Sequence, residues 1–444
     1  MTLDELKAAV DGGDVDTVLL ALTDMQGRLQ GKRFHARHFV EAVAAHGAEA
    51  CNYLLAVDVD MNTVSGYAMS SWERGYGDFV MRPDLDTIRR VTWHEGTALV
   101  LADVAWADGA PVTASPRQVL RAQLDRLAQR GWGANVGTEL EFIVFRDSYE
   151  QAFAKGYRDL SPANDYNVDY SLLGTARVEP LIRRVRNAMF DAGLHVENSK
   201  GECNFGQHEI NFRYQDALRA CDEHAIFKNG IKEIASQEGM AVTFMAKYDR
   251  REGSSCHVHV SLSRPDGSAV FADEPETFDR FLAGLLATLP ESTFFLAPNV
   301  NSYKRFAEGS FAPTVVAWGP DNRTCSLRVV GRAGSDSRRI ECRLGGADLN
   351  PYLAIAALIA GGLHGVDERL ELEPPVEGNA YVSDRPRVPG TLRDARDALA
   401  SSAVLRSALG DDVVEHYLNN AAVELAAFDA AVTDWERYRG FERL

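Results

Sequence analysis

Hydrophobic and polar residues alternate in four segments of the chain, and each segment has an apolar side and a side of Glu, His or Arg. In residues 137–145, GTELEFIVF, Glu139 and Glu141 fall on one side and Leu140 on the other. Such alternation predicts β-strands, because successive side chains of a strand point to opposite faces. The other three segments are residues 208–213 (HEINFR), 255–262 (SCHVHVSL) and 338–344 (RRIECRL). Together they predict a curved sheet whose concave side is a charged cavity.

Three- and four-residue spacing of apolar positions predicts helices elsewhere. A helix is expected after Ser115, which is a candidate N-cap, with Pro116 at the first helical position and Gln118 completing a capping-box pattern. Gly131 is expected to stop it. Near the C-terminus, apolar residues recur between 414 and 435, and this stripe predicts a helix that packs on the core or on another subunit.

The first part of the chain is predicted to form a small mixed unit. An opening helix precedes a strand, DTVLLALTD (residues 16–24), and a turn, MQGRLQGKR (residues 25–33). Residues 106–116, WADGAPVTASP, are rich in Gly, Pro and small residues and indicate a boundary. We therefore expect an α+β protein with one domain over residues 1–106 and a larger one over residues 107–444.

Charge and composition narrow the class of partner. The 444 residues carry a formal net charge of -17, with a pI near 5.1, so we expect no binding to nucleic acid or to an anionic membrane. The longest apolar run, YLAIAALIAGGL, is too short and too broken by Gly to span a bilayer. The N-terminus lacks a signal pattern, and none of the six cysteines forms a C-x-x-C pair. These features predict a cytoplasmic protein.

The polar sides of the four predicted strands suggest metal binding. Glu139 and Glu141 would be roughly 6.6 to 6.8 Å apart on one strand face, which lets each bind a different ion. An isolated E-x-E is usually a solvated strand face, and an isolated H-x-H is more often a structural pair. Four such strands in one domain favour a site, and carboxylates with imidazoles but no thiolate suit Mg²⁺ or Mn²⁺.

Arginines add a second requirement to this cavity. The arginines at 305, 323, 328, 339 and 343 need anionic partners, while clustered glutamates without a cation raise one another's pKa. Enzymes that transfer phosphoryl groups often combine divalent ions with arginines, because negative charge develops on the oxygens of the transferring phosphoryl group.

Six motifs occur in a fixed order along the chain: GTELEF, GECNFGQHEINF, EGSSCHVHVSL, NSYKRF followed by AP, NRTCSLRV and RRIECRLGGADLNPYLA. As a set they resemble the glutamine synthetase superfamily over nearly the whole chain. The resemblance implies a small N-terminal β-grasp-like domain and a large catalytic domain with a curved antiparallel sheet flanked by helices. It also implies a homo-oligomer, a dodecamer of two stacked hexameric rings, with active sites between neighbouring subunits.

The resemblance also implies roles for individual residues. Two or three Mg²⁺ or Mn²⁺ ions are expected, one on Glu141, Glu202 and Glu209 and a second on Glu139, His257 and Glu341. The expected ATP contacts are Glu197, Phe212, Tyr214, His259, Ser261, Arg323 and Arg328. The expected L-glutamate contacts are Gly253, Arg305, Arg323 and Arg343, of which Arg323 and Arg343 also act in catalysis.

The loop at residues 303–314, YKRFAEGSFAPT, departs from the ammonia-using members of the family. Those members carry a glutamate where this chain has Phe311, and an aspartate ahead of the tryptophan that corresponds to Trp72. Loss of both residues removes the two carboxylates that would bind ammonium. Phe311 instead offers apolar surface, and each methylene group that it covers contributes about 0.8 kcal/mol of binding free energy. We therefore expect the acceptor to be a carbon-bearing amine that contacts Phe311. Glu308 could replace the lost base or could equally be exposed to solvent.

The pattern around these positions is similar to the actinobacterial branch of the superfamily that makes γ-glutamylethanolamide or γ-glutamylpolyamines. The implied activity is an ATP-dependent γ-glutamyl–amine ligase, with ethanolamine as first choice and a polyamine or methylamine next. A hydroxyl or second amine of the acceptor could reach Glu308, Asp58 or Asp60. The alternatives are an ammonia-using glutamine synthetase and an inactive scaffold. Retention of all six metal-site residues argues against the scaffold.

Overall fold

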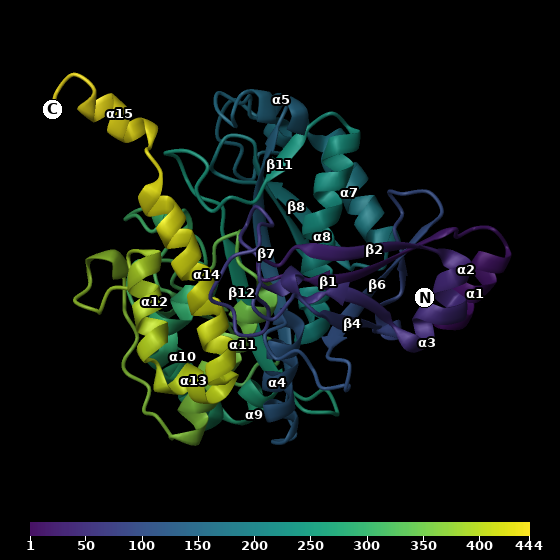
Figure 1. Cartoon of the computed structure of the whole chain (residues 1–444). Coiled ribbons are helices and arrows are strands. Elements are labelled where there is room, and N and C mark those ends of the chain that lie inside the picture. The colour runs from purple at the N-terminus through teal and green to yellow at the C-terminus, as the bar shows by residue number, and fades with distance from the viewer.

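The computed structural model describes all residues from 1 to 444, and its elements form two sheets (Figure 1). The smaller sheet has the strand order β2-β1-β6-β4-β3, with β5 paired to β6. Its strands are β1 (Thr17–Thr23), β2 (Leu29–His35), β3 (Ala48–Cys51), β4 (Asp78–Pro83), β5 (Arg89–Arg90) and β6 (Thr97–Ala105). Strands β1 and β6 run parallel, and the other pairs are antiparallel. Helices α1 (Leu3–Asp11), α2 (Ala36–His38) and α3 (Ala44–His46) belong to the same part of the chain.

The larger sheet has nine strands in the order β13-β14-β15-β12-β7-β9-β8, with β10 and β11 paired to β7. These strands are β7 (Gly133–Phe145), β8 (Val196–Gly201), β9 (Gln207–Phe212), β10 (Gln215–Asp216), β11 (Ala241–Thr243), β12 (Cys256–Ser263), β13 (Trp318–Pro320), β14 (Leu327–Val330) and β15 (Arg339–Cys342). Only β13 and β14 pair in parallel. The four strands predicted from alternation are β7, β9, β12 and β15, and they are neighbours in this sheet, which confirms the predicted α+β fold with a large, mainly antiparallel sheet.

Helices surround the larger sheet, and the C-terminal ones gather on one side of it in Figure 1. They are α4 (Pro116–Ala128), α5 (Tyr149–Ala154), α6 (Leu172–Thr175), α7 (Glu179–Asp191), α8 (Ala217–Gln237), α9 (Val270–Asp273), α10 (Pro275–Leu296), α11 (Pro351–Asp367), α12 (Leu392–Ser401), α13 (Ala403–Leu409), α14 (Asp411–Ala430) and α15 (Asp434–Gly440). The apolar sides of the strands and these helices bury one cluster of 82 hydrophobic residues.

The long apolar run noted in the sequence is helix α11, and it is buried over nearly its full length. It crosses α10 at a point where both helices have glycine. A Cβ added at Gly284 would lie 2.2 Å from the carbonyl oxygen of Gly361, so the crossing requires glycine. No helix of the structure combines the length and apolar character needed to cross a membrane.

Two local predictions need correction. Helix α4 does begin at Pro116, but the side chain of Ser115 makes no capping hydrogen bond, so the predicted capping box is wrong. The predicted turn at residues 25–33 is shorter, because strand β2 already begins at Leu29. The C-terminal apolar stripe packs on the core within α14, and beyond that helix Trp435 is 68% exposed, where contact with another subunit stays a prediction.

Arg117 at the start of α4 joins the two parts of the molecule. Its guanidinium donates hydrogen bonds to Asp84 and Asp103 beside the small sheet, each at 2.7 Å, and to both carboxylate oxygens of Asp222 in α8 at 3.0 and 2.9 Å. Arg117 is 2% and Asp222 is 3% exposed, so the bonds to Asp222 are formed away from water, whereas Asp84 and Asp103 are partly exposed. The domain boundary at residue 106 stays a prediction.

Candidate active site

Strand register places the predicted polar residues on one face of the larger sheet. His257 on β12 lies opposite Glu139 on β7, and His259 lies opposite Glu341 on β15. On the other side of β7, Glu141 lies opposite Glu209 of β9. Since the side-chain period of a strand is two, this register also fixes which face the remaining residues share.

One group of carboxylates forms where β7, β9 and the segment after β8 meet. Oxygen atoms of Glu141, Glu202 and Glu209 all lie within 4.8 Å of one another. One oxygen of Glu141 is fixed by the backbone N–H of Ser255 at 2.8 Å and by Nε2 of Gln207 at 3.0 Å. These three residues are the predicted ligands of the first ion, and the structure brings them together.

The charges of this group favour a bound cation. Burial and the neighbouring Glu141 raise the pKa of Glu209 to about 7. Burial also raises the pKa of Glu141, although the N–H of Ser255 and the nearby arginines oppose it. Enclosed carboxylates this close together are stabilised when a divalent ion supplies positive charge and takes their free lone pairs.

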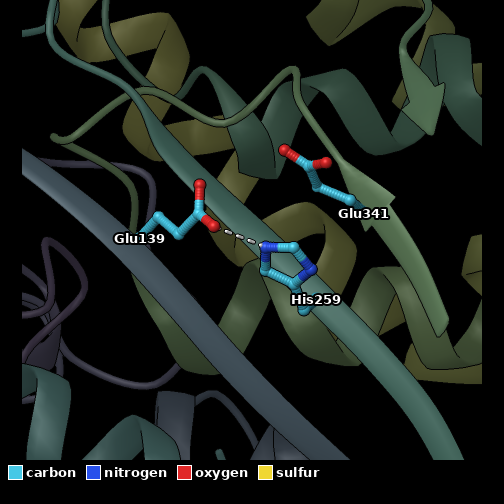
Figure 2. A group of neighbouring side chains, drawn as sticks. All are labelled: Glu139, His259 and Glu341. Carbon is cyan, nitrogen blue, oxygen red and sulfur yellow. Dashed lines mark hydrogen bonds and ion pairs between the residues drawn. The ribbon is translucent and has the colours of Figure 1, made fainter. Parts of the chain in front are cut away.

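A second group lies at the centre of the sheet, where Glu139, His259 and Glu341 come from three neighbouring strands (Figure 2). Nε2 of His259 lies 3.0 Å from Oε1 of Glu139, and Nδ1 of His257 lies 3.1 Å from Oε2 of the same carboxylate. Burial raises the pKa of Glu139, but the hydrogen bonds from the two histidines outweigh it and leave this pKa below its ordinary value.

His257 and His259 differ in what their second ring nitrogen contacts. Nδ1 of His259 accepts a hydrogen bond from Nε of Arg339 at 3.2 Å, whereas Nε2 of His257 is buried and has no partner. Burial and the nearby Arg343 lower the pKa of His257, which favours the neutral imidazole, the form that binds metal. An orphaned imidazole nitrogen beside Glu139 and Glu341 fits a divalent ion. The predicted division, with His257 on metal and His259 on ATP, stays a prediction.

A cavity of about 840 Å³ opens beside the second group. Its lining includes Glu139 and five of the predicted ATP contacts, namely Glu197, Phe212, Tyr214, His259 and Ser261. Tyr214 is 60% exposed and lies over Gly137, where an added Cβ would be 3.6 Å from its own Cβ. The volume and the mixed aromatic and polar lining suit a nucleotide-sized ligand.

Two predicted glutamate contacts are packed against each other. Arg305 is 1% exposed, and its Nη1 donates to Oγ of Ser255 at 3.0 Å while its Nη2 donates to the carbonyl oxygen of Leu344. A Cβ at Gly253 would lie 2.6 Å from Cγ of Arg305 and 2.4 Å from a backbone oxygen. Glycine is therefore required at 253 for Arg305 to occupy this position.

Arg343 lies between the metal-site residues and the loop, while Arg323 lies apart. Nη1 of Arg343 donates to Glu341, and its Nε donates to the carbonyl oxygen of Arg323 at 3.2 Å. The side chain of Arg323 is exposed and lines a separate cavity of about 520 Å³ with residues 375–378. The structure therefore does not bring the Arg323 side chain to the other predicted nucleotide contacts. Arg328 is joined to the site through Glu341, to which it donates at 2.8 Å.

The loop that carries Phe311 has an unusual backbone. Phe311 has a φ of 57°, a left-handed conformation that costs a non-glycine residue about 1 to 2 kcal/mol, and the residue is 57% exposed. The hydroxyl of Tyr381 donates to the carbonyl oxygen of the next residue, Ala312, at 3.1 Å.

The candidate acidic residues have other partners. Glu308 is exposed, and its Oε1 lies 3.6 Å from Nη2 of Arg387. The carboxylate of Asp58 accepts hydrogen bonds from the backbone N–H of Asn62 at 2.8 Å and from its side-chain amide at 3.0 Å.

Sequence reasoning missed two residues of the site, Gln207 and Lys200. Gln207 orients Glu141, and Lys200 contacts Glu202 and lies 3.7 Å from Glu209. The alternation in SKGECN, which puts positions 200 and 202 on one face, was a usable signal for Lys200. Gln207 gave none, because a glutamine beside a buried carboxylate has no distinct pattern.

Comparison with known proteins decides the family. The family described as glutamine synthetase, catalytic domain, matches residues 113–439. The chain belongs to the glutamine synthetase family. Members of this family use ATP and divalent metal ions and act on glutamate with ammonia or an amine, so both the predicted family and the coarse chemistry of the site are confirmed.

Within the family, the chain is similar to enzymes that use organic amines. It is 62% identical to the gamma-glutamylethanolamide synthetase GlnA4 of Streptomyces coelicolor, over 100% of this chain and 96% of that protein. It is 38% identical to a glutamate–isopropylamine ligase of a Pseudomonas species, over 97% and 96% of the two chains. Its fold matches a solved GmaS/ADP complex with a TM-score of 0.87, at 27% identity and over 100% of both chains.

Proposed function

We propose that this protein is an ATP-dependent ligase that couples the γ-carboxylate of L-glutamate to a small organic amine, with ethanolamine as first choice. The observation that supports this best is Phe311 at the tip of the loop beside Arg343. An apolar side chain there favours an acceptor with carbon atoms over ammonium. The 62% identity to a gamma-glutamylethanolamide synthetase supports the same choice.

The proposed reaction has two steps. An oxygen of the glutamate γ-carboxylate attacks the terminal phosphorus of ATP, which releases ADP and leaves an acyl phosphate. The amine nitrogen then attacks the acyl carbon, phosphate leaves and the nitrogen gives up a proton. Bound divalent ions would neutralise the carboxylates and draw negative charge from the transferring phosphoryl group. Glu141, Glu202 and Glu209 would hold one ion, and Glu139, His257 and Glu341 a second.

The chain's own residues bind and orient the two substrates. The cavity of about 840 Å³ would hold the nucleotide, with His259, Ser261 and Tyr214 along its wall. Arg305 and Arg343 would hold glutamate, and Gly253 leaves the room that Arg305 needs. Arg328, which is bonded to Glu341, would contact the phosphates beside the second ion, as would Arg323 once its exposed side chain turns inward.

Phe311 would cover the carbon atoms of the acceptor and help exclude water from the acyl phosphate. Glu308 is the candidate base for the amine proton, and it must leave Arg387 to act.

We also propose that the protein forms a homo-oligomer of stacked rings, with active sites between neighbouring subunits.

Release of phosphate from ATP in the presence of glutamate tests the proposal. We expect release with ethanolamine, weaker release with putrescine, spermine or methylamine, and little with ammonia, with γ-glutamylethanolamide identified by mass spectrometry. Ammonia as the best acceptor would instead assign an ammonia-using glutamine synthetase. Absence of phosphate release with every amine, in a folded protein that binds ATP, would favour the inactive scaffold.

A further inference from the structure

Lys200 lies within the first carboxylate group. It is on β8 directly opposite Glu209 of β9, so both side chains rise from the same face of the sheet. Its Nζ forms a hydrogen-bonded ion pair with Glu202 and lies 3.7 Å from Oε1 of Glu209. The same ammonium lies 4.9 Å from the centre of the Tyr170 ring, within reach of a cation–π interaction.

No other basic side chain comes within 4 Å of Glu202 or Glu209. The third carboxylate, Glu141, has its own donors in Gln207 and the backbone N–H of Ser255. The side chains of Glu209 and Glu202 are only 3% and 13% exposed, and that of Lys200 is 21% exposed. Enclosed charges of this kind depend on each other, because water cannot replace a lost partner.

A divalent ion on this group needs the same oxygen atoms that Lys200 contacts. Carboxylate oxygens bind Mg²⁺ or Mn²⁺ at about 2.0 to 2.2 Å, and an ammonium on the same lone pairs blocks that approach. Lysine can leave, since its ammonium is a point charge on a flexible stem rather than a rigid fork. The face of Tyr170 offers the displaced ammonium a nearby position.

We propose that Lys200 is a built-in counter-ion of the group formed by Glu141, Glu202 and Glu209, and that it competes with a divalent ion for Glu202 and Glu209. The inference rests on the metal assignment in the proposed function. Metal affinity at this group is then lower than three carboxylates alone would give, and metal binding moves the Lys200 ammonium off them. Lys200 also keeps these carboxylates paired in protein that carries no ion there.

Titration of the full-length protein with Mn²⁺, followed by the electron paramagnetic resonance signal of free Mn²⁺, tests this without nucleotide or glutamate. Lys200→Met removes the charge and keeps most of the stem, so one ion should bind about tenfold more tightly or better. Lys200→Arg keeps the charge and should not gain affinity. Lys155→Met, which breaks the pair with Asp147 outside the site, is the matched control and should match wild type.

Thermal unfolding gives a second readout. In chelator, Lys200→Met should have a lower Tm than wild type, and Mn²⁺ should raise its Tm by more than it raises that of wild type. Adding Glu209→Gln to Lys200→Met should abolish the gain in affinity, which assigns it to this group.

Unchanged or weaker Mn²⁺ binding by Lys200→Met would overturn the inference. That failure would leave the proposed ligase in place if wild type still releases phosphate with ethanolamine. No Mn²⁺ binding by any variant would overturn the inference and the metal assignment together.

Discussion

Arg328 and Glu341 face each other directly across strands β14 and β15, and Nη1 of Arg328 donates a hydrogen bond to Oε2 of Glu341 at 2.8 Å. Glu341 is fully buried and also accepts from Arg343. Burial raises the pKa of Glu341, but His257 and Arg343 outweigh it and leave the pKa below its ordinary value. Glu341, a proposed metal ligand, is thus held in its charged form by Arg328 and Arg343, which are proposed to bind the substrates.

We predict that Glu341→Gln reduces kcat by about a hundredfold or more, because an amide is a poor ligand for a divalent ion and because it leaves Arg343 without its anion and Arg328 with only the exposed Asp321. The amide still accepts one hydrogen bond, so the protein should fold, which circular dichroism checks. Phosphate release with saturating ATP, glutamate and ethanolamine measures the loss. The control is Asp321→Asn, which removes the exposed partner of Arg328 and should change kcat by less than about threefold.

Arg343→Lys should weaken glutamate use. Arginine presents two parallel N–H donors to a carboxylate, and lysine cannot copy them, so we expect the KM for glutamate to rise by about 10- to 100-fold with a smaller effect on the KM for ATP. Steady-state phosphate release at varied glutamate concentration measures this KM. Arg130→Lys, in the exposed pair with Asp367, is the control. An unchanged KM for glutamate, or equal use of aspartate, would remove Arg343 from the glutamate site.

Arg117 should be important for stability rather than for catalysis. Arg117→Met leaves Asp222 buried without its cation, and we expect the free energy of unfolding to fall by about 3 to 5 kcal/mol. Urea unfolding at fixed protein concentration measures this. Arg130→Met breaks an exposed pair and should cost about 0 to 1 kcal/mol. Equal effects of the two substitutions would mean that the contacts of Arg117 add nothing beyond a surface pair.

Much of the fold could be predicted from local pattern. Alternation identified β7, β9, β12 and β15 and the face on which Glu139, His257 and Glu341 lie, because the two-residue period of a strand is a local property. It could not give the register. His257 lies opposite Glu139, 118 residues earlier in the chain, and such a pairing depends on how the whole sheet packs.

The wrong and missing predictions concern features that depend on tertiary contacts. Ser115 has the residue type and the position of an N-cap, but its side chain forms no capping bond. The left-handed backbone of Phe311 and the bond from Tyr381 to Ala312 depend on contacts between segments about 70 residues apart. Sequence pattern identifies residues that can take part in a site, and tertiary packing decides which of them meet.

A primary alkylamine acceptor reaches the site protonated and must lose a proton before it attacks the acyl phosphate. Ammonium has no carbon atoms, so it gains nothing from Phe311, and position 311 itself supplies no anion to bind it. We therefore expect kcat/KM for ethanolamine to exceed that for ammonia by about a hundredfold in wild type, since two methylenes on an apolar surface are worth about 1.6 kcal/mol and the lost anion adds to this.

Phe311→Glu should narrow this ratio by about tenfold or more, because it places an anion where ammonium binds and removes the apolar surface. Phe311→Gly is the matched control, since glycine tolerates the φ of 57° and removes the ring without adding charge. It should lower kcat/KM for ethanolamine and leave ammonia use unchanged. If Phe311→Glu leaves the ratio unchanged, or if ammonia is already the better acceptor in wild type, Phe311 does not select the amine and the specificity must lie in other residues.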